Sequence, residues 1–442
     1  MRSTHLYWIA AVFGVLTSRQ PVVAQGSAGV FDVLGYAATV RPDIQRKTVA
    51  GQVEIQLRIV AKEVQTIEFD RADLVVDEVR AHGERLAFDL LPGRVRVHLP
   101  TPEARDALAD LSIAYHGEPR SGLQFVPERQ QVYTIFSTSQ WLICVDAPGD
   151  KATLDLRVVL PSGLRAVGTG TLVSEEPGPN GTVVHRWRQD TPLSTYLFGF
   201  AAGRFIEQQT KRAGTTLRYI GEGVSPDELD RIFRDTPDML EFFAHRAGVT
   251  YPGDIYTQVL VVSTAGQEAG GFSLLSDAYG RAVLNEPSGV WLIAHELAHQ
   301  WWGNLVTCQD WTQFWLNEGV ASFMADAYDE HRFGRAVYLQ DIERASARYE
   351  AVRQAGGDRS LVFPDWNRPT ANDRTLVYQK GAYVLHLLRE HMGEEAFWTG
   401  IRRYTAAFAG RTATTDDFKR SMEESSGSSL GAFFDRWVYL RQ

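Results

Sequence analysis

Cysteine is scarce in this sequence. Its 442 residues include only two, Cys144 and Cys308, which excludes a scaffold held together by disulfides. The sequence leaves open whether the two meet, and a pair of buried free thiols is the simpler expectation. Positive charge is also in deficit, because 45 lysines and arginines face 54 aspartates and glutamates, for a net charge of −9. A nucleic-acid-binding surface would require the opposite balance, so no polynucleotide partner is expected.

Long hydrophobic runs are absent as well. The clearest apolar stretch is Leu6 to Leu16, eleven residues that follow Arg2. A membrane-spanning helix needs about 20 apolar residues, so this stretch is too short to cross a bilayer. It fits the core of a secretory signal peptide, and the small residues Val22 and Ala24 suit a cleavage site. We therefore predict that residues 1–24 are a signal peptide and that the mature protein, without an integral membrane span, is secreted or periplasmic. The alternative is an uncleaved anchor.

The sequence does have the composition of a folded globular protein, with 44% hydrophobic and 22% charged residues. Its length suits two large domains. In the first half, polar and apolar residues alternate in Gln52–Ile59, Arg94–Leu99 and Leu154–Leu160, which is the pattern of half-buried strands. We predict an all-β domain over residues 25–208.

The pattern changes in the second half. Thr216–Ile220 and Tyr256–Val262 have the pattern of strands, whereas Val290–Trp302 and Trp315–Tyr328 have that of helices. Strands followed by several helices are typical of an α+β fold. We predict an α+β domain over residues 209–442, so the whole chain falls in the α+β class.

One motif in the second domain carries metal chemistry. Residues 295–299 are His-Glu-Leu-Ala-His, and on a helix His295 and His299 lie one turn apart on the same face. Two imidazoles in this arrangement can bind one Zn²⁺. Glu296 lies beside them and can act as a general base on the attacking water.

A catalytic zinc site with an open position needs a third protein ligand. Glu318 lies nineteen residues after His299, in the first turn of the next predicted helix. A short strand expected at 305–307 would let the two helices pack side by side. Glu318 would then complete a His₂Glu site. The alternative is a carboxylate that is favoured there only by the helix dipole.

These residues resemble a known family. The sequence from His295 to Asn304, followed by Trp-Leu-Asn-Glu-Gly at 315–319, resembles the membrane alanyl aminopeptidases, which are zinc metallopeptidases of the gluzincin group. Tyr378-Gln379-Lys380-Gly381 is similar to the Tyr-x-Lys-Gly motif of that family, and residues 141–151 are similar to its Pro-Cys-x-Asp segment. The resemblance implies an amino-terminal β-saddle or sandwich domain followed by a thermolysin-like catalytic domain.

The resemblance also implies roles for individual residues. One Zn²⁺ would be held by His295, His299 and Glu318. Glu296 would be the general base, and the hydroxyl of Tyr378 would stabilise the oxyanion of the tetrahedral state.

Two positions depart from the family pattern. The family's Gly-x-Met-Glu-Asn segment, whose glutamate holds the amino terminus of the substrate, corresponds to Gly270-Gly271-Phe272-Ser273-Leu274, so Ser273 replaces that glutamate. Thr134 stands where the β domain usually supplies a second acidic or amide side chain. Glu268 could substitute, but residues five apart on one strand face opposite sides, so it would reach the side of Ser273 only through a bulge or an irregular Gly270-Gly271. The alternative for Glu268 is a solvated loop acid. The diglycine at 270–271 fits a strand edge that a peptide backbone approaches closely.

Three functions remain open at this point. The first is a zinc aminopeptidase that acts on peptides or proteins. The second is a peptidase for blocked amino termini or internal bonds, which the changes at Thr134 and Ser273 suggest. The third, of another class, is a peptide-binding module without turnover, although the presence of ligands, base and tyrosine together argues against it. Residue preference and oligomeric state do not follow from the sequence.

Overall fold

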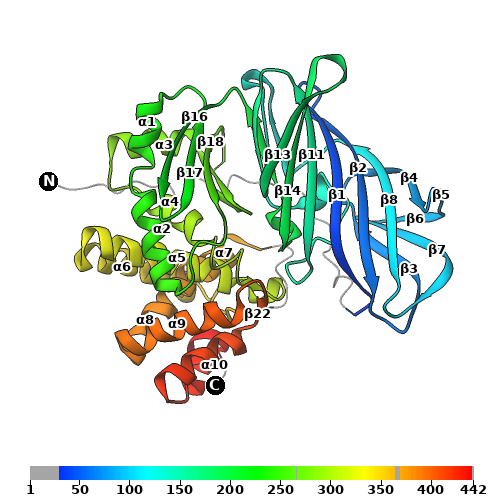
Figure 1. Ribbon diagram of the computed structural model, residues 1–442. Helices are drawn as coiled ribbons and strands as arrows, with labels where there is room; N and C mark the ends of the chain where they lie inside the picture. Colours follow the sequence, from blue (N-terminus) through cyan, green and yellow to red (C-terminus); the bar gives the residue numbers. More distant parts are fainter. Residues whose placement is uncertain (1–28, 265, 364–368, 441–442) are drawn as a thin grey trace. The chain divides into compact units, whose positions relative to one another are not determined.

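The computed structural model describes residues 29–264, 266–363 and 369–440. The predicted signal peptide, residues 1–24, lies outside these residues. The order of elements matches the expected fold class, because β-strands dominate the first half and helices the second (Figure 1). By their internal contacts, the described residues within 29–209, 218–230 and 257–284 form a first unit, and those within 210–217, 231–256 and 285–440 form a second. The predicted domain boundary at 208 remains a prediction.

The first unit is built on an eight-stranded sheet with the strand order β13-β14-β11-β1-β2-β8-β4-β5. These strands are β1 (Phe31–Asp43), β2 (Thr48–Ile59), β4 (Val75–Ala81), β5 (Glu84–Arg85), β8 (Leu108–Gly117), β11 (Lys151–Pro161), β13 (Thr171–Pro177) and β14 (Thr182–Ser194). Buried and exposed residues alternate along β2 and β11, so one face of the sheet covers the core and the other carries polar side chains. The strands predicted at 52–59 and 154–160 are confirmed.

Two smaller sheets complete the β-rich part. One contains β3 (Glu63–Asp70), β7 (Arg94–Ala104) and β6 (Phe88–Leu91), which confirms the strand predicted at 94–99. The other contains β12 (Arg165–Gly168), β15 (Phe200–Gly203), β10 (Gln131–Thr134) and β9 (Leu123–Val126). Their apolar side chains join those of the large sheet in one aliphatic and aromatic cluster, which is the core of the first unit.

A five-stranded sheet follows in the sequence, with the order β16-β17-β18-β20-β19. The strands are β16 (Ile206–Arg212), β17 (Thr215–Gly221), β18 (Ile255–Val261), β19 (Gly266–Ala269) and β20 (Phe272–Ser276). β19 is an edge strand and forms an antiparallel hairpin with β20, while β20 runs parallel to β18. Residues 257–284, which include this hairpin, belong to the first unit.

Helices make up most of the remaining chain. They are α1 (Pro226–Ile232), α2 (Thr236–Ala247), α3 (Asp277–Asn285), α4 (Trp291–Ala298), α5 (Trp315–Phe333), α6 (Arg335–Gln354), α7 (Ala371–Thr375), α8 (Gly381–Met392), α9 (Glu394–Phe408), α10 (Thr415–Ser426) and α11 (Gly431–Phe434). Two π-helical segments, η6 (Leu376–Lys380) and η7 (Asp435–Tyr439), and two short strands, β21 (Thr307–Cys308) and β22 (Thr412–Ala413), lie among them. None of the described helices is long and apolar enough to cross a membrane.

The helix that carries the histidine motif is shorter than predicted. α4 ends at Ala298 rather than near Trp302, because the next amides leave the α-helical hydrogen-bond pattern: Gln300 donates to the carbonyl of Leu297, three residues back instead of four. The strand expected at 305–307 is also displaced to β21, and α5 continues five residues past Tyr328 to Phe333. α4 and α5 nevertheless pack against each other, as the predicted metal site requires.

Candidate active site: a buried His₂Glu group

The second unit brings three potential metal ligands together. His295 lies in the last turn of α4, His299 caps that helix, and Glu318 lies in the first turn of α5. The two Nε2 atoms are 3.1 Å apart, and each lies 3.3 Å from Oε2 of Glu318. All three side chains are buried, with exposed fractions of 4%, 1% and 1%.

These separations fit a tetrahedral zinc ion. Nitrogen and oxygen ligands bind Zn²⁺ at about 2.0–2.1 Å, and tetrahedral angles then place any two donor atoms about 3.3 Å apart. The observed distances of 3.1 and 3.3 Å agree with this value. The donor set of two imidazoles and one carboxylate is also one that zinc prefers in catalytic sites, and it leaves one position for substrate or water.

The histidines are held in the form that binds metal. The carbonyl of Trp302 lies 3.1 Å from Nδ1 of His299, so this nitrogen donates a hydrogen bond to it and Nε2 is directed toward the other ligands. Burial lowers the pKa of His295, an effect that Glu318 opposes only in part, so the imidazole is neutral near pH 7. The turn after α4 therefore places the carbonyl of Trp302 where it orients the ring of His299.

Glu318 is held as a carboxylate. Burial by itself raises its pKa, but His299 and His295, when their imidazoles are protonated, outweigh burial and bring the pKa to about 2. The first turn of α5 is anchored on both sides. Asn317 accepts a hydrogen bond from the backbone of Cys308 at 3.0 Å, and the indole of Trp315 donates to Thr415 at 2.9 Å. The ligand thus comes from a rigid helix start.

The two predicted catalytic residues lie in the same unit as the ligands. Glu296 directly follows His295 on α4, and its side chain is buried. Tyr378 is half-buried in η6, and its ring stacks near-parallel to that of His295 at a centroid distance of 6.0 Å. The structure therefore brings Tyr378 next to the metal-binding group although 83 positions separate it from His295 in the sequence.

Two further residues support the site and were not predicted. The indole of Trp291 stacks on His295 at 5.0 Å with an interplanar angle of 18°, and its Nε1 donates to Asp326 at 2.7 Å. Burial raises the pKa of Asp326 to about 7, although the Trp291 hydrogen bond opposes this effect. The i,i+4 spacing of Trp291 and His295 was available in the sequence, but the partner on α5 was not.

The predicted substrate-binding residues belong to the first unit, and here the structure corrects one expectation. Glu268 on β19 pairs directly with Ser273 on β20 in the antiparallel register. Directly opposed residues of an antiparallel pair project to the same face. The alternation of a single strand, which would put these side chains on opposite sides, does not apply here, because the chain reverses at the irregular Gly270-Gly271 segment and so brings Glu268 to the side of Ser273. A carboxylate therefore lies beside Ser273, on the edge strand of the sheet.

The diglycine has a different role from the one predicted. Gly270 and Gly271 form the two-residue turn of the hairpin rather than a strand edge, and Gly271 has a φ of +82°. A side chain at 270 would meet Leu193 at 2.5 Å, so the position is packed within the first unit. The strand edge expected at 270–271 is therefore a turn that directly follows the edge strand β19, and pairing of a peptide backbone with this segment stays a prediction.

Thr134 is committed to the fold. Its hydroxyl accepts a hydrogen bond from the backbone of Phe200 at 3.0 Å, and the side chain is buried. This position in β10 therefore holds two strands of the four-stranded sheet together.

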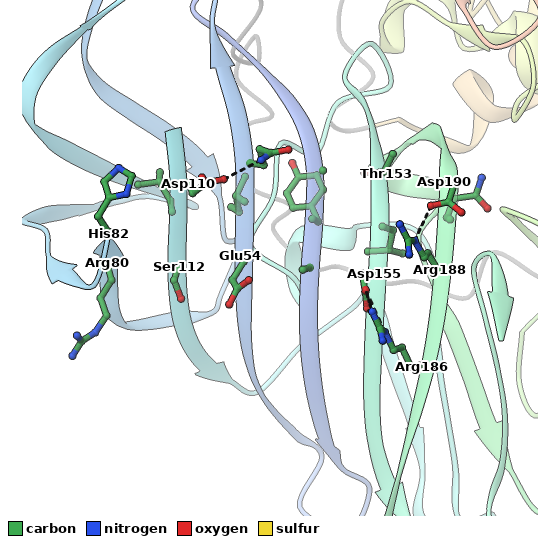
Figure 2. Close-up of a pocket in the computed structure, with 18 of the residues that line it drawn as sticks. Glu54, Arg80, His82, Asp110, Ser112, Thr153, Asp155, Arg186, Arg188 and Asp190 are labelled. Carbon is green, nitrogen blue, oxygen red and sulfur yellow. Dashed lines mark hydrogen bonds and ion pairs between the residues drawn. The ribbon is translucent and has the colours of Figure 1, made fainter. Parts of the chain in front are cut away.

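A broad trough of about 760 Å³ lies elsewhere in the first unit, on the outer face of the eight-stranded sheet. Figure 2 shows its charged lining, in which Arg186 pairs with Asp155 and Arg188 with Asp190. None of the described residues that line it belongs to the histidine–glutamate group. The metal chemistry of the chain is therefore assigned to the second unit.

A zinc-binding His-Glu-x-x-His helix, a glutamate from the following helix and an α+β fold define a zinc metallopeptidase of the gluzincin class. Residues 34–197 match the Peptidase M1 N-terminal domain, and residues 233–437 match the Peptidase family M1 domain. The chain belongs to the peptidase M1 family.

Its relatives are aminopeptidases by name. Aminopeptidase M1-A of rice is 30% identical over 67% of this chain and 35% of its own length. Aminopeptidase N of Lactococcus lactis is 26% identical over 90% of this chain and 50% of its own length. The chain thus spans about half or less of these curated relatives. An M1 zinc metallopeptidase of Deinococcus radiodurans, solved with a Tyr-Ser-Ala substrate, has the same fold: TM-score 0.80, 24% identity, and coverage of 94% of this chain and 96% of that one.

Proposed function

We propose that this protein is a zinc-dependent aminopeptidase that removes residues from the amino terminus of peptides. The observation that carries the proposal is the cross-strand pairing of Glu268 with Ser273. It gives the edge strand the carboxylate that recognition of a substrate ammonium group requires. The names of the curated relatives and the tripeptide bound to the Deinococcus enzyme support the same substrate class.

The residues of the second unit supply the chemistry. His295, His299 and Glu318 would hold Zn²⁺, which would supply Lewis-acid activation of a water molecule and of the scissile carbonyl. Glu296 takes the proton of the attacking water and later delivers it to the leaving amine. The hydroxyl of Tyr378 donates a hydrogen bond to the oxyanion that develops on the carbonyl oxygen.

A second candidate function follows from Thr134. Its hydroxyl is bonded to the backbone of Phe200, so this position offers no second group to a substrate amine. With one anchor instead of two, the enzyme would discriminate less strongly between free and blocked amino termini. Hydrolysis of blocked or internal peptide bonds is then the alternative activity.

The experiment compares aminoacyl arylamides with their N-acetylated forms in wild type and Glu268→Gln. We expect wild type to prefer the free amines. The variant should lose about ten- to a hundredfold in kcat/KM for them, because a hydrogen bond to a charged group contributes about 1.5–3 kcal/mol. Hydrolysis of the acetylated substrates should not change. Glu54→Gln, on the exposed face of β2, is the matched control and should stay within about twofold.

A wild-type enzyme that cleaves acetylated and free substrates equally would favour the alternative activity. The third possibility, a binding module without turnover, is tested with Glu296→Gln. Equal residual rates in this variant and in wild type, at equal zinc content, would mean that Glu296 performs no catalysis.

We also propose that the protein is exported, on the strength of the apolar stretch from Leu6 to Leu16. Expression of the full chain followed by cell fractionation and amino-terminal sequencing tests this. A mature amino terminus near residue 25 in the exported fraction is the expected result, and an intact amino terminus in the cytosolic fraction would contradict it.

A further inference from the structure

The segment that carries Tyr378 has an unusual backbone. Leu376–Lys380 winds as a π-helix, η6, and continues directly into α8 at Gly381. π-helical turns are rare and occur frequently at functional sites. Such a turn persists only where neighbouring groups hold it, so its contacts identify the residues that set the position of Tyr378.

Two glycines bring this segment against the helix of the metal ligand. A Cβ atom on Gly381 would lie 2.8 Å from Cα of Gly319. A Cβ atom on Gly319 would lie 3.0 Å from Cα of Gly381 and 3.1 Å from the carbonyl oxygen of Val377. Glu318 directly precedes Gly319, and Tyr378 directly follows Val377. The backbone beside the zinc ligand therefore touches the backbone on both sides of the tyrosine.

Lys380 fixes the other side of the π-helical segment. Its ammonium group is completely buried and donates to Asp358 at 2.8 Å and to the carbonyl of Arg359 at 2.9 Å. The second oxygen of Asp358 accepts from the hydroxyl of Tyr349 on α6 at 2.8 Å. A buried ammonium group is tolerated only when it is paired in this way, so the segment cannot shift without breaking the pair.

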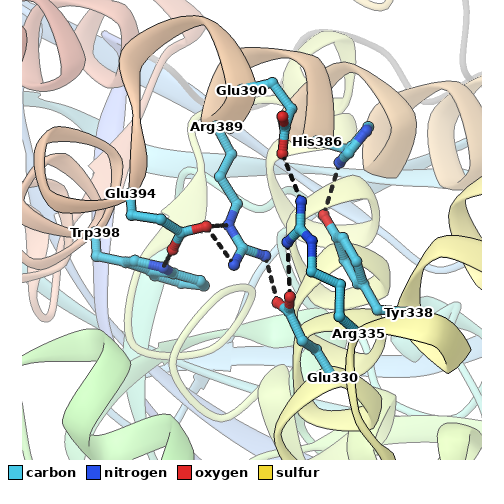
Figure 3. A network of polar contacts seen from close by, with 8 residues as sticks. All are labelled: Glu330, Arg335, Tyr338, His386, Arg389, Glu390, Glu394 and Trp398. Carbon is cyan, nitrogen blue, oxygen red and sulfur yellow. Dashed lines mark hydrogen bonds and ion pairs between the residues drawn. The ribbon is translucent and has the colours of Figure 1, made fainter.

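The far ends of the same two helices are joined as well. Figure 3 shows Arg389 of α8 between Glu330, at the end of α5, and Glu394. Glu330 also pairs with Arg335, which reaches Glu390 of α8. α8 is thus attached to α5 at its start by the glycine contact and at its end by ion pairs, and it acts as a rigid support for the residues before it.

We propose that Lys380, Gly319 and Gly381 are positioning residues that hold the Tyr378 hydroxyl at a set distance from the metal-binding atoms. The inference rests on the proposed function, in which this hydroxyl stabilises the oxyanion. A displacement of about 1 Å at a catalytic group can cost about a hundredfold in rate, so a modest loosening of the segment should be measurable.

The test is a double-mutant cycle between Lys380 and Tyr378. Lys380→Met is combined with Asp358→Asn, so that no unpaired carboxylate is left, and kcat and KM are measured with Tyr378 present and in the Tyr378→Phe background. With Tyr378 present we expect kcat to fall about tenfold, with KM and zinc content unchanged. In the Tyr378→Phe background the same pair of changes should cost less than about twofold, because the group that they position is already gone.

Equal losses in both backgrounds would overturn the positioning role. If Tyr378→Phe alone keeps the wild-type rate, the proposed role of Tyr378 fails instead, so the two failures are distinguishable. Should the Lys380 variant not fold, Tyr349→Phe removes one hydrogen bond from Asp358 and goes through the same cycle, with an expected loss of about two- to threefold.

Hydrogen exchange of the metal-free protein gives a readout that does not depend on activity. Amides of residues 376–381 should exchange faster in the Lys380 variant than in wild type, while those of α10 should not change. Unchanged exchange in 376–381 would overturn the proposal. Lys419→Met is the matched control, because this partly exposed lysine makes only a 4.0 Å ion pair; its rate and exchange should equal those of wild type.

Discussion

The eight-stranded sheet and the helical unit place their charged side chains differently. The sheet carries its ion pairs on the outer face, as in Arg186–Asp155, while the residues on its other face join an apolar core. The helical unit places charges inside. Lys380 is completely buried, and the side chain of Arg389 is 5% exposed. The metal-binding group is buried to the same degree.

The difference indicates what the charges do. Exposed ion pairs contribute little to stability, because water already solvates both partners. A buried charge is costly unless its partner is in place, so each buried pair fixes the relative position of the elements that carry it. On the sheet, the ion pairs lie in solvent; in the helical unit, the buried pairs fix how α5, α6 and α8 pack against one another. Four substitutions test this contrast.

The largest effect is expected from the metal-binding group. Glu318→Gln should lose bound zinc and reduce kcat/KM by more than about a hundredfold. Removing a residue that only hydrogen-bonds to a metal ligand already costs up to about a hundredfold, so loss of the ligand itself should cost more. Metal content and arylamide hydrolysis measure both. Glu54→Gln, in the lining of the sheet trough, is the control and should change neither. A Glu318→Gln protein with full zinc content would contradict the ligand assignment.

Breaking a buried ion pair should have the next largest effect. Arg389→Met leaves Glu330 without its closest partner at 2.6 Å and should lower the free energy of unfolding by about 3 kcal/mol, the low end of the usual range, since Glu394 is solvent-exposed. Chemical unfolding followed by fluorescence measures it. Adding Glu330→Gln should recover part of the loss; no recovery would mean that packing of the arginine, rather than its charge, is what matters.

The buried acid on α5 gives a smaller, pH-dependent effect. Burial raises the pKa of Asp326 from 3.8 to about 7, so the folded protein binds this proton more tightly than the unfolded chain. The contribution of this proton to the free energy of unfolding is fully present below about pH 4 and is lost as the pH rises to about 7. Asp326→Asn, which keeps an acceptor for Trp291, should raise Tm by about 2–4 °C at about pH 8 and by much less at about pH 4. A shift independent of pH would contradict this explanation.

The smallest effect is expected on the sheet. Arg186→Met removes the partner of Asp155 on the outer face, and the hydrogen bonds that are lost there are replaced by water. Tm and arylamide hydrolysis should both stay within experimental error of wild type. A clear loss of stability would show that charges in the two regions are not used differently.

Local sequence patterns predicted much of the fold and the metal-binding group. Alternation identified the strands at 52–59 and 154–160, and helical spacing identified His295 and His299. Glu318 could be assigned because its helix follows closely in the sequence. The side of the sheet taken by Glu268 could not be predicted from alternation, which holds only along a single strand and fails where the chain reverses.

Contacts between distant segments were also beyond prediction. Asp326 lies 35 residues from Trp291, and Glu330 lies 59 residues from Arg389. Each of these acids fits the pattern of an ordinary helix, and only the packing of the helices shows which partner it meets. The early end of α4 was also missed, because the sequence gives no sign that the amides of Gln300 and Trp301 donate to carbonyls three residues back instead of four.

The hairpin turn at Gly270 and Gly271 fixes the side of the sheet on which a carboxylate lies through backbone pairing alone. Because Glu268 and Ser273 are directly opposed in an antiparallel ladder, their side chains share one side. A shift of this ladder by one residue would turn Glu268 to the reverse side together with every other residue of its strand. Insertions or deletions that displace the strand could therefore move the carboxylate without any substitution at position 268.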